Sequence, residues 1–191
     1  MYTQGSPHAQ NPQKRRLKIP RRHRKGAGTL LDFALWFILA LAIVVGLLTA
    51  FQAARDGMRA ISLRTQLVKA QSIIESAHQH SGIYAGGSLL VFLNDAGFSD
   101  QQLQRISAGV YTFTTPYDTA ITIGGNGARD FTITVNGVPQ KGCSAALMAF
   151  RESGAGLDSA TVNGSALTLP LTAGAAQTAC DNPTNTVGLT F

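Results

Sequence analysis

The sequence is poor in the residues that most enzyme active sites and metal sites require. Its 191 residues include two cysteines and four histidines, and His8 and His23 lie within the first 26 residues. His78 and His80 are two positions apart on an expected helix, so their side chains do not share a face. The sequence contains no Ser/His/Asp spacing, no metal-ligand cluster and no complete phosphate-binding loop. These absences predict a protein that is not an enzyme and that needs no cofactor and no metal.

Acidic residues are missing from residues 1–26, which hold eight of the sixteen lysines and arginines. The remaining residues carry eight basic and ten acidic side chains, a formal charge of −2, so the excess of positive charge in the whole chain (+6) comes from this leader alone. A basic tail can bind nucleic acid or anionic lipid. Beside a hydrophobic helix, its commoner role is to keep that end of the chain in the cytoplasm. We favour the topological role and expect no direct nucleic-acid partner.

Charge is also absent from residues 33–51, a run of nineteen mostly large apolar residues directly behind Asp32. As a helix the run would be roughly 28 Å long, which is enough to cross a bilayer core. The apolar core of a secretory signal peptide is shorter, about 7–15 residues, and is followed by a small-residue cleavage site that is not evident here. We expect the run to be retained, with the following residues on the far side of the inner membrane.

The helix is expected to begin near Thr29, a usable N-cap that places Asp32 in the first turn, and to continue to about residue 80. Its second part has one apolar stripe, formed by Leu63, Leu67, Ala70, Ile74 and Ala77. The other faces carry polar side chains, namely Arg55, Asp56, Arg59, Arg64, Lys69, Gln71 and Glu75. A helix with such a stripe must lie on another element.

The rest of the chain predicts an α+β body. Alternation of apolar residues with threonine predicts strands at residues 110–114, 119–123 and 131–135, with further strands at 166–169 and 186–191. Short helices are expected at residues 89–94, 99–106 and 140–151, turns at 124–127 and 136–137, and a loop at 154–164. An antiparallel sheet with one apolar face can then be covered by the apolar stripe of the long helix.

Cys143 and Cys180 are too far apart in sequence for a CxxC redox pair, and a zinc site would need additional ligands. In an oxidising compartment a disulfide is the simplest interpretation. It would close a segment of 38 residues, worth roughly 4 kcal/mol in the chain-entropy model. Two unpaired buried thiols are the alternative.

Residues 26–32, Gly-Ala-Gly-Thr-Leu-Leu-Asp, followed by the apolar run, resemble the start of a type IV pilin. The long leader is similar to that of the type IVb branch. Residues 131–147 resemble the strand, turn and cysteine-bearing helix of that branch, and Cys180 and residues 186–191 match its second cysteine and last strand. Within the branch, the chain most resembles the PilS-like major pilins of thin pili, found on conjugative plasmids and some enteric pathogens.

This resemblance implies a type IV pilin fold, in which a long N-terminal helix with a protruding hydrophobic half packs on an antiparallel sheet with a disulfide-bounded C-terminal region. It implies a cleaved basic leader (1–26), a transmembrane and filament-core helix (27–53) and a globular head (54–191). The head would comprise an amphipathic helix half (54–80), a connecting loop (81–109) and the sheet and disulfide region (110–191).

The resemblance also implies cleavage of the leader after a glycine. We favour the bond between Gly26 and Ala27, which makes Asp32 the sixth mature residue; the alternative, between Gly28 and Thr29, makes it the fourth. Cleavage between Ala27 and Gly28 would place Asp32 fifth, where the family has a glutamate, but that bond lacks the preceding glycine. By family logic, Asp32 pairs with the α-amino group freed by cleavage, on the same or an adjacent subunit, and sets the register of assembly. The alternative role for Asp32 is to stabilise the helix N-terminus through its macrodipole.

The implied function is that of a structural subunit: a prepilin of the bacterial inner membrane, cleaved and N-methylated by a prepilin peptidase and polymerised into an extracellular filament. The implied partners are further copies of the chain, the peptidase, the inner-membrane assembly machinery and, before assembly, membrane lipid. The filament would serve adhesion, aggregation or conjugative mating contact. The alternatives are a minor pilin or type II secretion pseudopilin, and an uncleaved bitopic membrane protein with a periplasmic binding domain.

Overall fold

The computed structural model describes residues 27–79, 83–84, 86–98, 102–151 and 156–191. The helices are α1 (Ala27–His78), α2 (Leu90–Asp95), α3 (Gln140–Ala149) and α4 (Ala173–Ala179). The strands are β1 (Gly87–Ser88), β2 (Leu103–Ser107), β3 (Val110–Thr114), β4 (Ala120–Gly125), β5 (Phe131–Val138), β6 (Ser159–Val162), β7 (Ser165–Leu167) and β8 (Asn185–Thr190). The chain divides into two compact units, one ending at Leu47 and the other running from Leu48 to Phe191, which we call the head.

Helix α1 is described from Ala27, so it already includes the two residues before the expected N-cap. Thr29 therefore lies inside the helix rather than capping it, and Asp32 lies beyond the first turn, which contains no acidic residue. No proline interrupts the sequence between Ala27 and Thr29, so nothing in it prevents the helix from extending to Ala27. The predicted C-terminal limit near residue 80 agrees with the observed end at His78.

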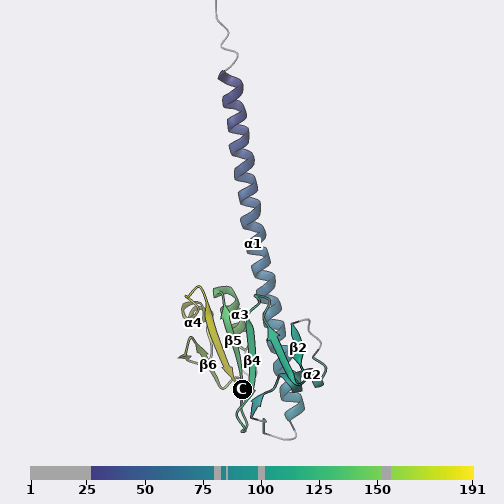
Figure 1. The fold of residues 1–191 in the computed structure, drawn as a ribbon. Helices are drawn as coiled ribbons and strands as arrows, with labels where there is room; N and C mark the ends of the chain where they lie inside the picture. The colour runs from purple at the N-terminus through teal and green to yellow at the C-terminus, as the bar shows by residue number, and fades with distance from the viewer. Residues whose placement is uncertain (1–26, 80–82, 85, 99–101, 152–155) are drawn as a thin grey trace, which may run out of the picture. The chain divides into compact units, whose positions relative to one another are not determined.

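The head is built on an antiparallel sheet in the order β2-β3-β4-β5-β8-β6-β7 (Figure 1). The short strand β1 pairs with the end of β4, where Ser88 lies opposite Gly124, while β3 pairs with the start of β4. The last strand, β8, lies between β5 and β6 and so joins two parts of the chain that are distant in sequence. The predicted α+β class is confirmed.

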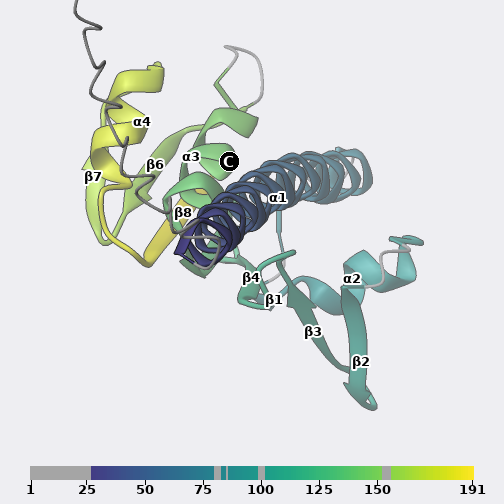
Figure 2. The same cartoon turned by 90° about the horizontal axis from the view of Figure 1, so that it is seen from above.

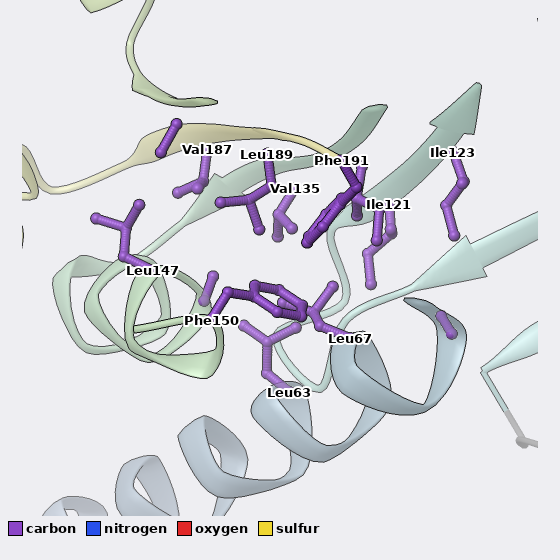
Figure 3. Packing of buried hydrophobic residues seen from close by; sticks show 14 of the residues in the cluster. Leu63, Leu67, Ile121, Ile123, Val135, Leu147, Phe150, Val187, Leu189 and Phe191 are labelled. Carbon is purple, nitrogen blue, oxygen red and sulfur yellow. The ribbon is translucent and has the colours of Figure 1, made fainter. Parts of the chain in front are cut away.

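One face of the sheet forms the core together with α1 and α3. Figure 3 shows Leu63 and Leu67 of α1 pointing toward Phe150 and the sheet. The predicted stripe is fully buried at four of its positions, Leu63, Leu67, Ala70 and Ile74. Full burial of one such leucine contributes about 1.5–3 kcal/mol relative to exposure. Because this part of α1 closes the core of the head, the head cannot be built without it.

The other helices cover the two ends of the same core. Figure 2 shows α3 and α4 on the side of β6 to β8, and α2 on the side of β2 and β3. Helix α3 presents Cys143, Ala146 and Leu147 to the core. Helix α4 was not predicted, although Thr172 is an N-cap whose hydroxyl accepts a hydrogen bond from the Ala175 amide at 3.2 Å.

The stripe of α1 was assigned incorrectly at its end. Ala77 is exposed, whereas Gln71, which was placed on a polar face, is buried. The Gln71 amide is accommodated because it donates a hydrogen bond to the Glu75 carboxylate at 2.7 Å. The spacing of apolar residues alone does not predict that a polar side chain is buried when a hydrogen bond compensates its amide.

The helix predicted over residues 99–106 is wrong for the part that the structure describes. Residues 103–107 form strand β2, whose Arg105 lies opposite Tyr111 of β3, and residues 99–101 lie outside the described residues. The helical pattern of glutamines and an N-cap serine is local, whereas the pairing with β3 satisfies a whole row of backbone groups. Tertiary pairing overrides local propensity here.

Two of the three Asn-Gly pairs of the chain have roles that differ from those predicted. Asn136 and Gly137, predicted as a turn, lie within β5, where the register shifts between Val135 and Val138 and Gly137 has a φ of 63°. They form a β-bulge.

Asn163 and Gly164 lie at the end of the segment that was predicted as a loop. They form the two-residue connection between β6 and β7, with φ values of 53° and 82°. Positive φ at both positions is the signature of a type I′ hairpin. Strand β6 therefore occupies part of the expected loop.

Candidate assembly site

The first part of α1 is unlike any other described segment, because it exposes large apolar side chains on every side. Residues 31–55 are all exposed, and Phe33 and Trp36 have exposed fractions of 72% and 71%. Among the described residues, α1 is the single helix long and apolar enough to cross a membrane. A soluble chain does not leave such a surface in contact with water. This segment therefore requires lipid or other protein around it.

Asp32 is the one charged residue between Ala27 and Ala54. No lysine, arginine or histidine occurs between Ala27 and Ala54, and the first cation, Arg55, lies about 35 Å further along the helix. Asp32 is exposed and lines a shallow hollow with Leu35, Trp36 and Leu39. A carboxylate that leaves water without a partner is strongly disfavoured. Its location thus calls for a cation from outside this part of the helix.

The predicted cleavage residues lie at the start of α1. Gly26 is outside the described residues, whereas Ala27 is the first residue of α1 and Gly28 and Thr29 lie in its first turn. Because Asp32 is beyond that turn, its interaction with the helix macrodipole is weaker than expected from the sequence, since that effect is confined to the first turn.

The two cysteines are joined. Cys143 in α3 and Cys180 at the end of α4 form a disulfide, with their Cα atoms 5.8 Å apart and both residues fully buried. The bond connects the two helices that cover one end of the core. This structural disulfide, rather than a redox or metal site, is the role of the cysteine pair.

The head-side part of α1 also has a second apolar surface that the sequence pattern did not reveal. Met58, Ile61 and Val68 are 63%, 69% and 40% exposed. Their spacing places them on one side of the helix, opposite the buried stripe. They could have been found by testing both sides of the helix rather than the stronger stripe alone.

Tyr117, in the turn between β3 and β4, contacts α1. Its hydroxyl donates a hydrogen bond to the backbone carbonyl of Asp56 at 3.2 Å, and the Arg59 guanidinium lies 5.8 Å from the ring centre. Burial raises the pKa of Tyr117, and the negative charge of Asp56 raises it further. The tyrosine is therefore part of the packing of the head.

The histidine in the described part of α1 lies among aromatic side chains. The His78 ring packs against Tyr84 and Phe92, at 4.6 and 4.9 Å between ring centroids, and its Nδ1 lies 2.9 Å from the Ile74 carbonyl. Burial raises the pKa of Tyr84, and the nearby Glu75 raises it further. Among the described residues, no group of three potential metal ligands was found.

Comparison with protein families shows to which family the chain belongs. The family model described as "PilS N terminal" matches residues 60–191, which is more than half of the chain. The chain belongs to the PilS family. It is a PilS-like type IVb pilin and a subunit of a type IV pilus, and the family indicates a structural role and homopolymeric assembly.

A solved structure supports the same assignment. The crystal structure of a type IVb pilin from Salmonella typhi is similar to this chain at 25% sequence identity, with a TM-score of 0.50. The match covers 70% of this chain and 97% of the Salmonella chain. No curated protein sequence matches this chain.

Proposed function

We propose that this PilS-like pilin is made as an inner-membrane precursor, cleaved and N-methylated by a prepilin peptidase, and polymerised into a filament on the cell surface. The single observation that carries the proposal is the exposed apolar part of α1, residues 31–55, beside a head that has its own closed core. A surface of this kind is stable in lipid before assembly and against other copies of the same helix afterwards.

The proposed processing removes the leader, residues 1–26, by cleavage between Gly26 and Ala27. The residues directly before this bond support it, because Gly26 is preceded by Lys25, as the family resemblance implies. Residues 27–53 would then form the membrane span and filament core, and residues 54–191 the head.

Asp32 is proposed to pair with the α-amino group that cleavage creates. Cleavage removes the eight positive charges of the leader and leaves one compact cation at the end of an apolar helix. A carboxylate at one fixed depth in that helix can accept the cation at one register, so the pair selects how far neighbouring subunits are offset. Burial without the partner is costly for either charge, which gives the pair its specificity.

Replacement of the acid tests this role. Asp32→Ala is expected to leave processing largely intact and to abolish filaments, while Asp32→Glu retains the charge and is expected to retain filaments. The measurements are the mass of the mature chain in membranes and the amount of pilin in sheared surface material. Asp95→Ala, which removes an exposed acid of α2 in the head, is the control. Normal piliation of Asp32→Ala would contradict the proposal.

The assembled filament is proposed to serve adhesion, aggregation or contact between mating cells. The abundance of the pilin in sheared filaments separates this role from that of a minor pilin or secretion pseudopilin, which would be present in few copies. A stable membrane form that keeps its leader would instead indicate the uncleaved bitopic protein.

A further inference from the structure

Asparagine followed by glycine occurs three times in the head, at residues 126–127, 136–137 and 163–164. This dipeptide can modify itself, because the glycine nitrogen can attack the side-chain amide of the asparagine and close a five-membered ring. Glycine favours the reaction because it has no Cβ to crowd its nitrogen and because it adopts backbone conformations that other residues avoid. The head therefore holds the same reactive dipeptide in three environments that can be compared.

Asn126 lies in the turn between β4 and β5, where the surroundings leave the reaction open. Residues 126–129 are all exposed, so water reaches both the side-chain amide and the following backbone. Gly127 has a φ of 77°, and a methyl group placed on it would have no heavy atom within 4 Å beyond its chain neighbours. The Gly127 nitrogen therefore has the space to move toward the Asn126 side chain.

Two hydrogen bonds orient the Asn126 amide for attack. The Ala128 backbone N–H donates to its Oδ1 at 2.9 Å, and its Nδ2 donates to the Asp130 carboxylate at 3.1 Å. The first bond turns the side-chain carbonyl toward the residues that follow, among them Gly127. It also stabilises the negative charge that develops on Oδ1 during the attack. The second bond fixes which end of the amide faces Ala128.

The Asn163 amide is held away from its glycine. Its Nδ2 donates to the Asn185 side-chain carbonyl at 3.0 Å, and its Oδ1 accepts from the Thr186 backbone N–H at 2.8 Å. Both partners belong to β8, so the amide is directed at a neighbouring strand rather than at Gly164. Ring closure at this site requires that both hydrogen bonds break first.

Asn136 has an intermediate environment. It lies in the bulge of β5 and is half-buried, and its Nδ2 donates to the Ala120 carbonyl of β4 at 3.3 Å. One weak side-chain bond restrains its amide less than the two bonds of Asn163 do. Strand pairing on either side of the bulge still limits the backbone rotation that ring closure needs.

We propose that Asn126 and Gly127 form a self-modification site that converts Asn126 to aspartate and isoaspartate in the folded pilin. Hydroxide takes the proton of the Gly127 N–H, and the nitrogen forms a bond to the Asn126 Cγ. The Cγ–Nδ2 bond then breaks, and the nitrogen leaves as ammonia after taking a proton from water. Water next opens the cyclic imide at either carbonyl, so each conversion consumes one water molecule. The reaction depends on neither leader cleavage nor assembly.

The products change the surface of the head and the attachment of a neighbouring segment. Each product adds a negative charge near Asp130, and isoaspartate also lengthens the backbone of the turn by one atom. The Ala128 carbonyl in this turn accepts a hydrogen bond from the Tyr84 backbone N–H at 2.8 Å. Isoaspartate should therefore weaken the attachment of the chain before β1, and this part of the surface should change with the age of the molecule.

The test compares the three asparagines within one sample of full-length pilin. Trypsin places them on three separate peptides, residues 106–129, 130–141 and 152–191. Mass spectrometry with fragmentation measures the exchange of NH for O at each asparagine during incubation at neutral pH. Each rate is divided by the rate at the same site in the unfolded, reduced chain, where all three asparagines precede glycine without tertiary contacts. The ratio isolates the effect of the fold.

Folding is expected to slow modification of Asn163 by at least about tenfold, because its two hydrogen bonds to β8 must break first. Asn126 should react in the folded chain at its unfolded rate or faster, and Asn136 should lie between the two. Equal protection of Asn126 and Asn163 by folding would overturn the proposal, as would a folded chain in which Asn126 stays unmodified while Asn136 reacts.

Substitutions in the same turn test how the site is built. Asn126→Gln keeps an amide but requires a larger ring, so modification of the peptide 106–129 should be lost. Asp130→Ala removes the acceptor of Nδ2 and should slow the reaction severalfold, whereas Asp130→Asn keeps an acceptor oxygen and should restore most of the rate. Asn136 in the same samples is the internal control for an intact sheet. Equal rates for Asp130→Ala and the parent chain, with Asn136 unchanged, would overturn the positioning role of Asp130.

Discussion

The two parts of helix α1 contain similar apolar residues but differ in burial. In residues 33–51, every side chain is exposed in the single chain. Between Leu63 and Ile74, leucine, alanine and isoleucine recur on one face and are fully buried against the head. The difference shows that a helix with one apolar face can bury that face against its own chain. A helix that is apolar on all faces needs lipid or other chains around it.

Because the exposed part of α1 does not belong to the core of the head, the head should unfold independently of it. The largest effect on head unfolding is expected from removal of its disulfide. The double variant Cys143→Ala/Cys180→Ala should lose about 4 kcal/mol of unfolding free energy, because the unfolded chain gains the entropy of an open 38-residue segment. Denaturant unfolding in detergent measures it. An unchanged midpoint would show that the disulfide does not stabilise the head.

A matched pair of leucines in the same helix tests the comparison directly. Leu67→Ala should cost about 2–5 kcal/mol of unfolding free energy, since it leaves a cavity in the core. Leu47→Ala, at a site with 65% exposure, should change the value by less than about 0.5 kcal/mol. Denaturant unfolding of the head measures both. Equal losses at the two sites would contradict the division between the two parts of α1.

Gly142 in the head and Gly46 in the exposed part of α1 differ in the space that surrounds them. A methyl group added at Gly142 of α3 would lie 2.8 Å from a ring carbon of Tyr117, while one added at Gly46 would have no neighbour within 4 Å. Gly142→Ala should therefore destabilise the head by about 1–3 kcal/mol through overpacking. Gly46→Ala should leave head unfolding unchanged. Comparable effects in thermal unfolding would show that the two sites are not packed differently.

The sequence predicts the helices and strands well where the spacing of apolar residues is regular. It predicts them poorly where pairing between distant strands determines the secondary structure. The leucine spacing from Leu63 onward and the threonine alternation in β4 and β5 are local signals, so helix α1 and these strands were predicted correctly. Strand β2 was missed because its pairing with β3 outweighs a local helix signal. The Asn-Gly pairs show that one dipeptide can make a bulge at Gly137 or a hairpin at Gly164, depending on which strands are paired around it.

The assembly site is predictable in part for a similar reason. An acid at the edge of an apolar run is visible in the sequence, so Asp32 was singled out. The shallow hollow that Asp32 lines with Leu35, Trp36 and Leu39 was not predicted, because it depends on how the side chains of one helix face are arranged. The exposed stripe through Met58 and Ile61 was hidden by the stronger stripe on the opposite side of the helix.

The central claim is that residues 1–26 are removed and the exposed part of α1 is then buried among copies of itself. Mass spectrometry of pilin from sheared surface filaments tests it most directly. The account predicts a mature chain that begins with N-methylated Ala27 and contains the intact Cys143–Cys180 disulfide. Filaments built from chains that still carry the basic leader would contradict it.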